Sequence, residues 1–202
     1  MATDVQYYFA PQSPWTYLGH LRFWDVARKH GARIEVLPVD LGGKVFPVSG
    51  GLPLGKRAPQ RQAYRLVEMQ RFSEHLHAPL NVAPKFFPVA GDDAARLIIA
   101  VAQHDGADAA MHITDAVLRA VWVEDRNIAD EATLAALLEE RELTARRLED
   151  AHSQAVAERY EANTQRAIEA GVFGAPSYVV GGEIFWGQDR LDFVDRRLAA
   201  QA

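Results

Sequence analysis

The chain places a serine, Ser13, directly before Pro14, where a short apolar stretch gives way to a long amphipathic one. Serine is a preferred cap at the N-terminus of a helix, and proline is a preferred first helical residue. Such a cap needs no function. A hydroxyl at this place also lies beside free backbone N–H groups and the positive end of the helix dipole, so it could donate a hydrogen bond to an anion such as a thiolate.

The surroundings of Ser13 do not favour its use as a hydrolase nucleophile. A serine nucleophile needs a base within hydrogen-bond reach, and no strong base is near Ser13 in the sequence. The sequence also contains no Gly-x-Ser-x-Gly motif. We therefore interpret Ser13 as a candidate hydrogen-bond donor to a bound anion.

Two segments near the C-terminus could bind an extended ligand. Gly174-Ala175-Pro176 precedes a predicted strand, where a proline either protects a sheet edge or accompanies a backbone that pairs with a peptide-like ligand. Trp186-Gly187-Gln188-Asp189 follows the next predicted strand. Asp189 could simply cap the last helix, or Gln188 and Asp189 could hold the ammonium and carboxylate of an amino-acid moiety. Both alternatives remain open for each segment.

Cationic residues occur in a stretch rich in glycine and proline. Residues 40–60 carry many such helix- and strand-breaking residues together with Lys44, Lys56 and Arg57. A loop of this length in a compact domain is typical either of a disordered segment or of a functional one. The cations make the functional alternative worth testing.

The composition excludes several other kinds of site. The 202 residues include no cysteine, so the chain has no disulfide, zinc-thiolate or iron–sulfur site. His75 and His77 lack the His-Glu-x-x-His spacing of zinc enzymes, and we expect no metal site. The net charge of −5 gives no electrostatic case for nucleic acid or an anionic membrane as a partner.

No sorting signal or membrane span is expected. The first residues lack the basic and apolar regions of a signal peptide, and no stretch approaches the ~18 consecutive apolar residues of a spanning helix. Together with the absence of cysteine, these features fit a cytoplasmic protein.

The hydrophobic pattern predicts the elements that position Ser13. Residues 5–10 and 34–39 are predicted strands on either side of a helix over residues 14–30. A strand–helix–strand unit implies a parallel pair of strands with a right-handed crossover. At the other end of the chain, two short apolar runs flank Gly181-Gly182, a pattern typical of a β-hairpin, before a last helix over residues 189–199.

The part between these two ends is predicted to be helical. Its periodicity of three and four residues predicts helices over residues 60–77, 92–105, 107–122, 131–140 and 144–170. We expect an α/β fold in which residues 1–45 and 172–202 form one domain with a four-stranded sheet. Residues 58–171 would form a large all-helical insertion domain.

These segments together resemble the 2-hydroxychromene-2-carboxylate isomerases, which belong to the thioredoxin-like proteins and are related to kappa-class glutathione transferases. The resemblance covers nearly the whole chain, residues 9–18 included, and is most specific in residues 172–177 and 185–191. It implies a thioredoxin-like βαβ–ββα sheet domain with the helices inserted. Redox members of that fold carry Cys-x-x-Cys where this chain has Ser13, so the resemblance excludes disulfide exchange by the protein itself.

The resemblance implies a glutathione-dependent enzyme of aromatic catabolism that interconverts 2-hydroxychromene-2-carboxylate and trans-o-hydroxybenzylidenepyruvate. Ser13 would hydrogen-bond the glutathione sulfur and stabilise its thiolate. Ala175, before a cis Pro176, would pair with the cysteinyl backbone of glutathione. The segment from Trp186 through Gly187 and Gln188 to Asp189 would hold the γ-glutamyl end.

The resemblance also bears on the substrate and on assembly. Lys44, Lys56 or Arg57 could bind the carboxylate of a small aromatic substrate, while Phe87 packs on its ring. Family members are commonly dimers, so we expect a homodimer.

Two alternatives remain open. A kappa-like glutathione transferase would use the same glutathione site but release a stable conjugate. A non-catalytic thioredoxin-like binding or chaperone module would keep the fold without the chemistry, and the absence of cysteine fits that too. The segment Trp186–Asp189 would then be unexplained.

Overall fold

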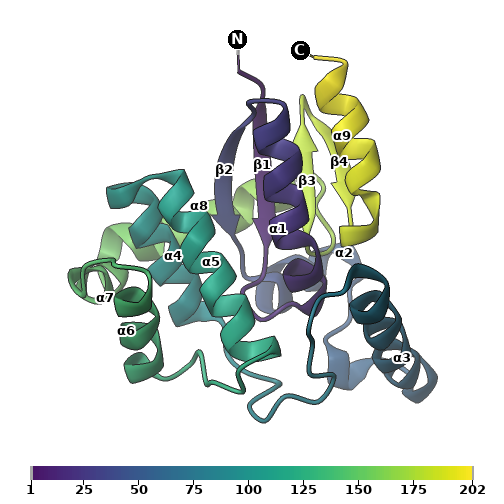
Figure 1. Cartoon of the computed structure of the whole chain (residues 1–202), viewed down its shortest axis with the longest axis horizontal. Helices are drawn as coiled ribbons and strands as arrows, with labels where there is room; N and C mark the ends of the chain where they lie inside the picture. Colours follow the sequence, from purple (N-terminus) through teal and green to yellow (C-terminus); the bar gives the residue numbers. More distant parts are fainter. Residues whose placement is uncertain (1, 202) are drawn as a thin grey trace.

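The computed structural model describes residues 2–201, and its sheet lies at the centre of one half of the molecule (Figure 1). Of its four strands in chain order, the first and second are parallel, whereas the third is antiparallel to both the first and the fourth. The predicted parallel pair and hairpin are confirmed, each strand within one residue of its expected bounds. In spatial order, the strands are β2 (Arg33–Pro38), β1 (Asp4–Phe9), β3 (Ser177–Val180) and β4 (Glu183–Trp186).

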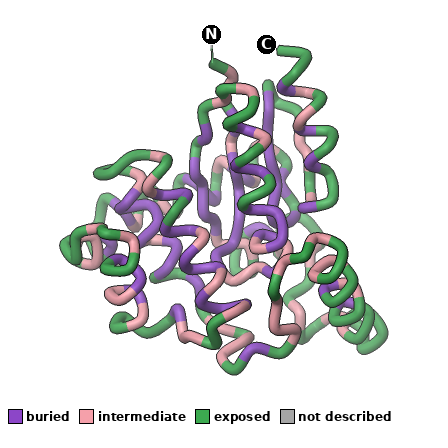
Figure 2. Tube along the Cα trace, in the orientation of Figure 1, coloured by how far each residue is buried: buried purple, intermediate pink, exposed green. Residues whose placement is uncertain are grey.

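Helices cover both faces of this sheet. Tyr7 and Phe9 of β1 share a hydrophobic core with α1 (Pro14–Lys29) and α9 (Leu191–Ala199). Tyr8 packs in a second core that includes Ala167 of α8 (Gln154–Glu169). Neighbouring side chains of a strand point to opposite faces, so a strand covered on both sides is apolar at most positions. The central strands are accordingly buried along most of their length (Figure 2).

Most of the predicted helices between β2 and β3 are confirmed, but the helix expected over residues 144–170 is wrong. It is divided into two helices, because Ser153 adopts an extended backbone and caps the second of them, α8. Its hydroxyl oxygen accepts a hydrogen bond from the Val156 amide at 3.3 Å. In order, the helices before α8 are α3 (Pro59–Leu76), α4 (Asp92–Asp105), α5 (Ala107–Trp122), α6 (Glu131–Glu140) and α7 (Arg146–Ala151).

The long irregular loop expected over residues 40–60 is also wrong in part. Asp40 begins a helical turn by accepting a hydrogen bond from the Gly43 amide at 2.7 Å, and Val45 is fully buried. These contacts order a segment that its glycines and prolines mark as irregular. Its short helical elements are η1 (Leu41–Val45), α2 (Phe46–Ser49) and η2 (Leu54–Lys56).

The helical part shares its core with the sheet. Ile98 of α4 and Val117 of α5 are fully buried in the same cluster as Tyr7 and Phe23. α1 lies against α5, which joins the first helix of the sheet region to the helical region. The division of the chain into a sheet domain and an insertion domain therefore stays a prediction.

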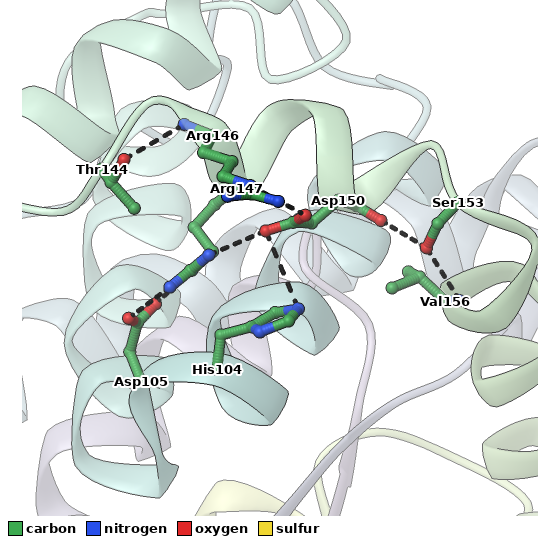
Figure 3. A network of polar contacts seen from close by, with 8 residues as sticks. All are labelled: His104, Asp105, Thr144, Arg146, Arg147, Asp150, Ser153 and Val156. Carbon is green, nitrogen blue, oxygen red and sulfur yellow. Dashed lines mark hydrogen bonds and ion pairs between the residues drawn. The ribbon is translucent and has the colours of Figure 1, made fainter.

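An arginine joins α7 to the end of α4 (Figure 3). Arg147 donates from Nε and Nη2 to the two carboxylate oxygens of Asp105, at 2.6 and 2.8 Å, and from Nη1 to Asp150 at 2.7 Å. The hydrogen bonds with Asp105 raise the pKa of Arg147 and lower the pKa of the Asp105 carboxyl. Bidentate charge-assisted bonds of this kind are among the stronger polar contacts in proteins.

Both ends of the described chain lie at one end of the sheet (Figure 1). Val5 pairs with Val180 at the end of β3. The next residue, Gly181, is so close to the C-terminal segment that a Cβ there would lie 3.2 Å from the Gln201 side chain. Ser13 follows the opposite end of β1.

Candidate active site

Ser13 caps α1, as predicted. Its Oγ accepts a hydrogen bond from the Thr16 amide at 3.2 Å, and its own amide donates to the Ala10 carbonyl at 3.0 Å. The hydroxyl proton has no acceptor within residues 2–201. Ser13 is only partly buried, so this proton is available at the positive end of the α1 dipole.

The peptide bond between Ala175 and Pro176 is cis, as expected. The Pro176 carbonyl accepts a hydrogen bond from the Gly187 amide at 2.9 Å, and the Ser177 hydroxyl donates to the Gly174 carbonyl at 2.8 Å. The backbone N–H and C=O of Ala175 have no partner elsewhere in the described chain. They are therefore available to a ligand with an extended backbone.

The strand register brings Ser13 and Ala175 to the same end of the sheet. Tyr8 of β1 is opposite Ser177 of β3, and the two strands are antiparallel. Continuing this register carries β1 toward Ala10, whose carbonyl accepts from Ser13, while β3 leads back toward Ala175. Two segments more than 150 residues apart in sequence thus converge on one place.

Gln188, the first residue of η3 (Gln188–Arg190), is buried against α1, with only 2% of its surface exposed. Its Oε1 accepts a hydrogen bond from Arg22 at 2.7 Å, and its Nε2 is buried with no acceptor in the described chain. A Cβ at Gly19 would lie 2.9 Å from the Gln188 Cβ, so Gly19 permits the close approach. Sequence reasoning missed Arg22, because its contact joins residues far apart in the chain.

The other residues of this segment are more exposed. Trp186 has 48% of its surface exposed and packs against Phe173, with the ring centroids 4.9 Å apart. Asp189 is exposed and forms an ion pair with Arg190. Gly187 has a φ of +102°, in the left-handed region that favours glycine. The predicted glutathione-binding segment therefore combines a fixed Gln188 with an exposed Trp186.

The predicted carboxylate-binding cations differ in their surroundings. Lys44 is exposed and forms an ion pair with Glu161 of α8. Lys56 is exposed at the end of η2. Arg57 donates from Nε to the Leu52 carbonyl at 2.8 Å, and burial lowers its pKa. Of these side chains, only Arg57 is partly enclosed by the protein.

A further arginine, which was not expected from the sequence, lies beside Phe87. Arg65 of α3 is 8% exposed, and its guanidinium carbon lies 5.1 Å from the centroid of the Phe87 ring. Burial lowers the pKa of Arg65 to about 10, and the charge of Arg57 adds to the effect. Arg65 is four residues before Met69, an apolar residue, and this spacing is the one sequence signal that the two share a face of α3.

Other kinds of site have less support. Within residues 2–201, no three His, Asp or Glu side chains are grouped so that they could hold a metal ion. None of the helices over this range could cross a membrane. A cavity of about 260 Å³ runs along β2, but it contains none of the residues discussed above.

Comparisons with known proteins agree on the family. The model of the DSBA-like thioredoxin domain matches residues 4–199. A 2-hydroxychromene-2-carboxylate isomerase of Pseudomonas putida is 33% identical to this chain, across 93% of this chain and 90% of its own. The chain belongs to the 2-hydroxychromene-2-carboxylate isomerase family, within the DSBA-like thioredoxin domains. A member of this isomerase family from Sphingobium xenophagum is 28% identical across 98% of this chain and 99% of its own.

Solved structures confirm the predicted thioredoxin-like fold. A 2-hydroxychromene-2-carboxylate isomerase superposes with a TM-score of 0.81 at 28% identity, over 98% of this chain and 95% of its own. The cytosolic disulfide reductase DsbM from Pseudomonas aeruginosa, solved with GSH, superposes with a TM-score of 0.68 over 98% of both chains. Its identity of 17% shows a common fold alone. Within the isomerase family, the serine at the start of α1 and the free backbone of Ala175 become the residues to test.

Proposed function

We propose that this protein is a glutathione-dependent isomerase that interconverts 2-hydroxychromene-2-carboxylate and trans-o-hydroxybenzylidenepyruvate. The observation that carries this proposal is the free hydroxyl proton of Ser13 at the N-terminus of α1, in a member of this family that has no cysteine. A protein without a thiol can use thiolate chemistry only if the thiol is brought by a small molecule.

The groups without partners fit glutathione. Ser13 would donate its proton to the sulfur, and the α1 dipole would favour the same negative charge. Ala175 would pair its backbone with the cysteinyl residue, since its N–H and C=O are free in the described chain. Gln188, with Trp186, Gly187 and Asp189 around it, would hold the γ-glutamyl end, and its buried Nε2 lacks an acceptor.

When bound, glutathione supplies a thiolate that can add to a conjugated carbon of the substrate. Addition converts the double bond into a single bond, which can rotate before the thiolate leaves again. The protein's part is to hold and orient the reactants. Phe87 would pack on the aromatic ring, and Lys56 or Arg57 would attract the carboxylate. Lys44 would first have to leave its ion pair with Glu161.

The activity can be tested directly. The purified protein should give an absorbance change with 2-hydroxychromene-2-carboxylate that requires glutathione. The concentration of free glutathione should be the same before and after the reaction. A stable glutathione conjugate in the mass spectrum of the products would instead indicate a transferase. Calorimetry that detects no glutathione binding would favour a non-catalytic module.

We also propose a cytoplasmic homodimer, on the resemblance to the isomerase family. The absence of cysteine supports a reducing compartment without requiring one. Sedimentation of the purified chain should give twice the monomer mass of 22.4 kDa. A monomer at micromolar concentration would contradict the assembly and leave the proposed chemistry unaffected.

We predict that Gly174→Ala weakens glutathione binding about tenfold, which is ~1.4 kcal/mol. A Cβ at Gly174 would overlap with Nε1 of Trp186, so the indole must move away from the glutathione segment. Because Trp186 is exposed, the free energy of unfolding should change little. Gly42→Ala is the control, since nothing lies within 4 Å of a Cβ there. Titration calorimetry with glutathione checks the prediction, which equal affinities would refute.

A further inference from the structure

Arg65 is a buried cation without a counter-charge. Only 8% of its surface is exposed, burial lowers its pKa, and it has no hydrogen bond or ion pair with an acceptor of residues 2–201. The charged side chain that acts on it is another cation, Arg57, which lowers the pKa of Arg65 further. Removing a charge from water without a partner is costly, so such groups are normally paired or bind a ligand.

A second unpaired donor lies in the same cluster. The guanidinium carbon of Arg65 is 5.7 Å from the centroid of the Trp122 ring, and Trp122 is fully buried with no acceptor for its Nε1–H in the described chain. Arginine and tryptophan side chains can donate hydrogen bonds but cannot accept them. What the cluster lacks is therefore an acceptor, and the positive charge makes an anionic acceptor the better one.

Aromatic rings surround this position. Phe87 lies between α3 and the end of α5, with its ring centroid 4.8 Å from that of Trp122. Arg65 is over both rings, and the 8% of its surface that is exposed keeps the group in reach of solvent. A ligand that pairs with Arg65 would thus meet aromatic surface beside the charge. This combination suits a planar aromatic carboxylate better than an inorganic anion.

Helix α3 connects this cluster to the start of α1. Arg65, Met69 and Phe72 are spaced so that they share one face of α3. The Phe72 ring packs edge-on against Trp15, two residues after Ser13, with the centroids 6.1 Å apart. On the other side, Gly91 at the end of the Phe87 segment is so close to Gln12 that a Cβ would overlap with its side chain. Both flanks of the cluster therefore contact residues next to Ser13.

We propose that Arg65 is the principal anchor for the carboxylate of the aromatic substrate, an inference that rests on the proposed function. The loop cations are weaker candidates, because Lys44 is paired with Glu161 and Lys56 is exposed to solvent. Charge pairs at exposed positions contribute little. Arg57 adds to the positive charge around Arg65, so a charged Arg65 without an anionic partner is still less favourable.

The test uses chromone-2-carboxylate, a stable planar carboxylate, and chromone, which lacks the carboxylate. Calorimetry without glutathione compares the wild type with Arg65→Met. The wild type should bind the carboxylate at least tenfold more tightly than chromone, and Arg65→Met should lose roughly 100-fold in affinity for the carboxylate, the size expected for a charged hydrogen-bonded pair. Chromone should bind equally to both.

Arg28→Met is the matched control, because Arg28 also lies over a tryptophan, Trp24, at 4.9 Å but is exposed and paired with Asp25. It should bind both probes as the wild type does. Thermal unfolding establishes whether Arg65→Met folds, and Arg65→Gln replaces it if it does not. The comparison of the two probes on the wild type needs no variant.

The inference and the proposed function fail separately. A wild type that isomerises the chromene with glutathione, but whose kcat/KM is unchanged by Arg65→Met, overturns the anchor role alone. Equal wild-type affinities for chromone and its carboxylate overturn it too. A wild type that has no glutathione-dependent activity, yet binds the carboxylate through Arg65, overturns the isomerase and leaves the anion site standing.

Discussion

Ser13→Ala should lower kcat/KM for the glutathione-dependent isomerisation by roughly 100-fold or more. Loss of one preorganised donor to a developing or bound anion costs enzymes about this much. In the structure, the Oγ of Ser13 already accepts from the Thr16 amide at 3.2 Å, which leaves its proton as the donor that the substitution removes. Steady-state kinetics at saturating glutathione would measure the effect, and an unchanged rate would refute the role of Ser13.

The effect of losing the helix cap must be distinguished from the effect of losing the hydrogen-bond donor, because Ser13→Ala removes both. Loss of a serine cap costs ~1 kcal/mol of stability by itself. Ser153→Ala removes an equivalent cap from α8 and should lower stability by a similar amount without affecting the rate. Ser13→Thr keeps both the cap and the hydroxyl and should retain most of the activity. The thiol pKa of bound glutathione, followed by ultraviolet absorbance, should rise in Ser13→Ala only.

Arg147→Met should lower the free energy of unfolding by about 2 kcal/mol, below the 3–5 kcal/mol typical of a fully buried pair. The side chain of Arg147 is 13% exposed, and those of Asp105 and Asp150 are 23% and 19% exposed. The substitution leaves two carboxylates near each other without their shared cation. Arg146→Met is the control, since Arg146 is 76% exposed and 3.9 Å from Asp150 (Figure 3). Urea unfolding should show almost no change for it.

The Arg147 effect should depend on pH with a definite sign. Arg147 holds the pKa of Asp105 below its usual value of 3.8. A carboxyl whose pKa is lower in the folded state adds stability above its unfolded pKa and loses it as the pH falls through the folded pKa. The difference between wild type and Arg147→Met should therefore be constant near pH 7 and shrink below about pH 4. A difference that grows in acid would contradict this assignment.

The strands could be predicted from the sequence because their signals are local. Two short apolar runs around Gly181-Gly182 fit a hairpin and little else, and both glycines have positive φ. The break between the two helices at Ser153 could not be predicted, because the helical periodicity of the sequence continues across it. The segment from Asp40 to Val45 was also hidden, since its order depends on one cap and one buried side chain rather than on composition.

In the candidate site, too, some residues could be predicted from local sequence signals and others could not. Ser13 and Ala175-Pro176 could be singled out because a cap and a proline before a strand are visible in the chain itself, and the family resemblance joined them. Arg65 could not, because its meaning depends on Phe87 and Trp122, which are brought to it from the end of a loop and the end of another helix. A charged residue on a helix reveals burial only when its neighbours are known.

The two ends of the described chain, residues 2 and 201, lie at the same end of the sheet (Figure 1), where Val5 pairs with Val180 and Gly181 approaches Gln201. Because Ser13 follows the opposite end of β1, an affinity tag, a fluorescent protein or a solid support attached beyond residue 2 or residue 201 would be held away from the candidate site. A short peptide bridging the two ends would likewise permit new termini to be opened in an exposed turn elsewhere. The protein is in this sense well suited to immobilisation and to circular permutation.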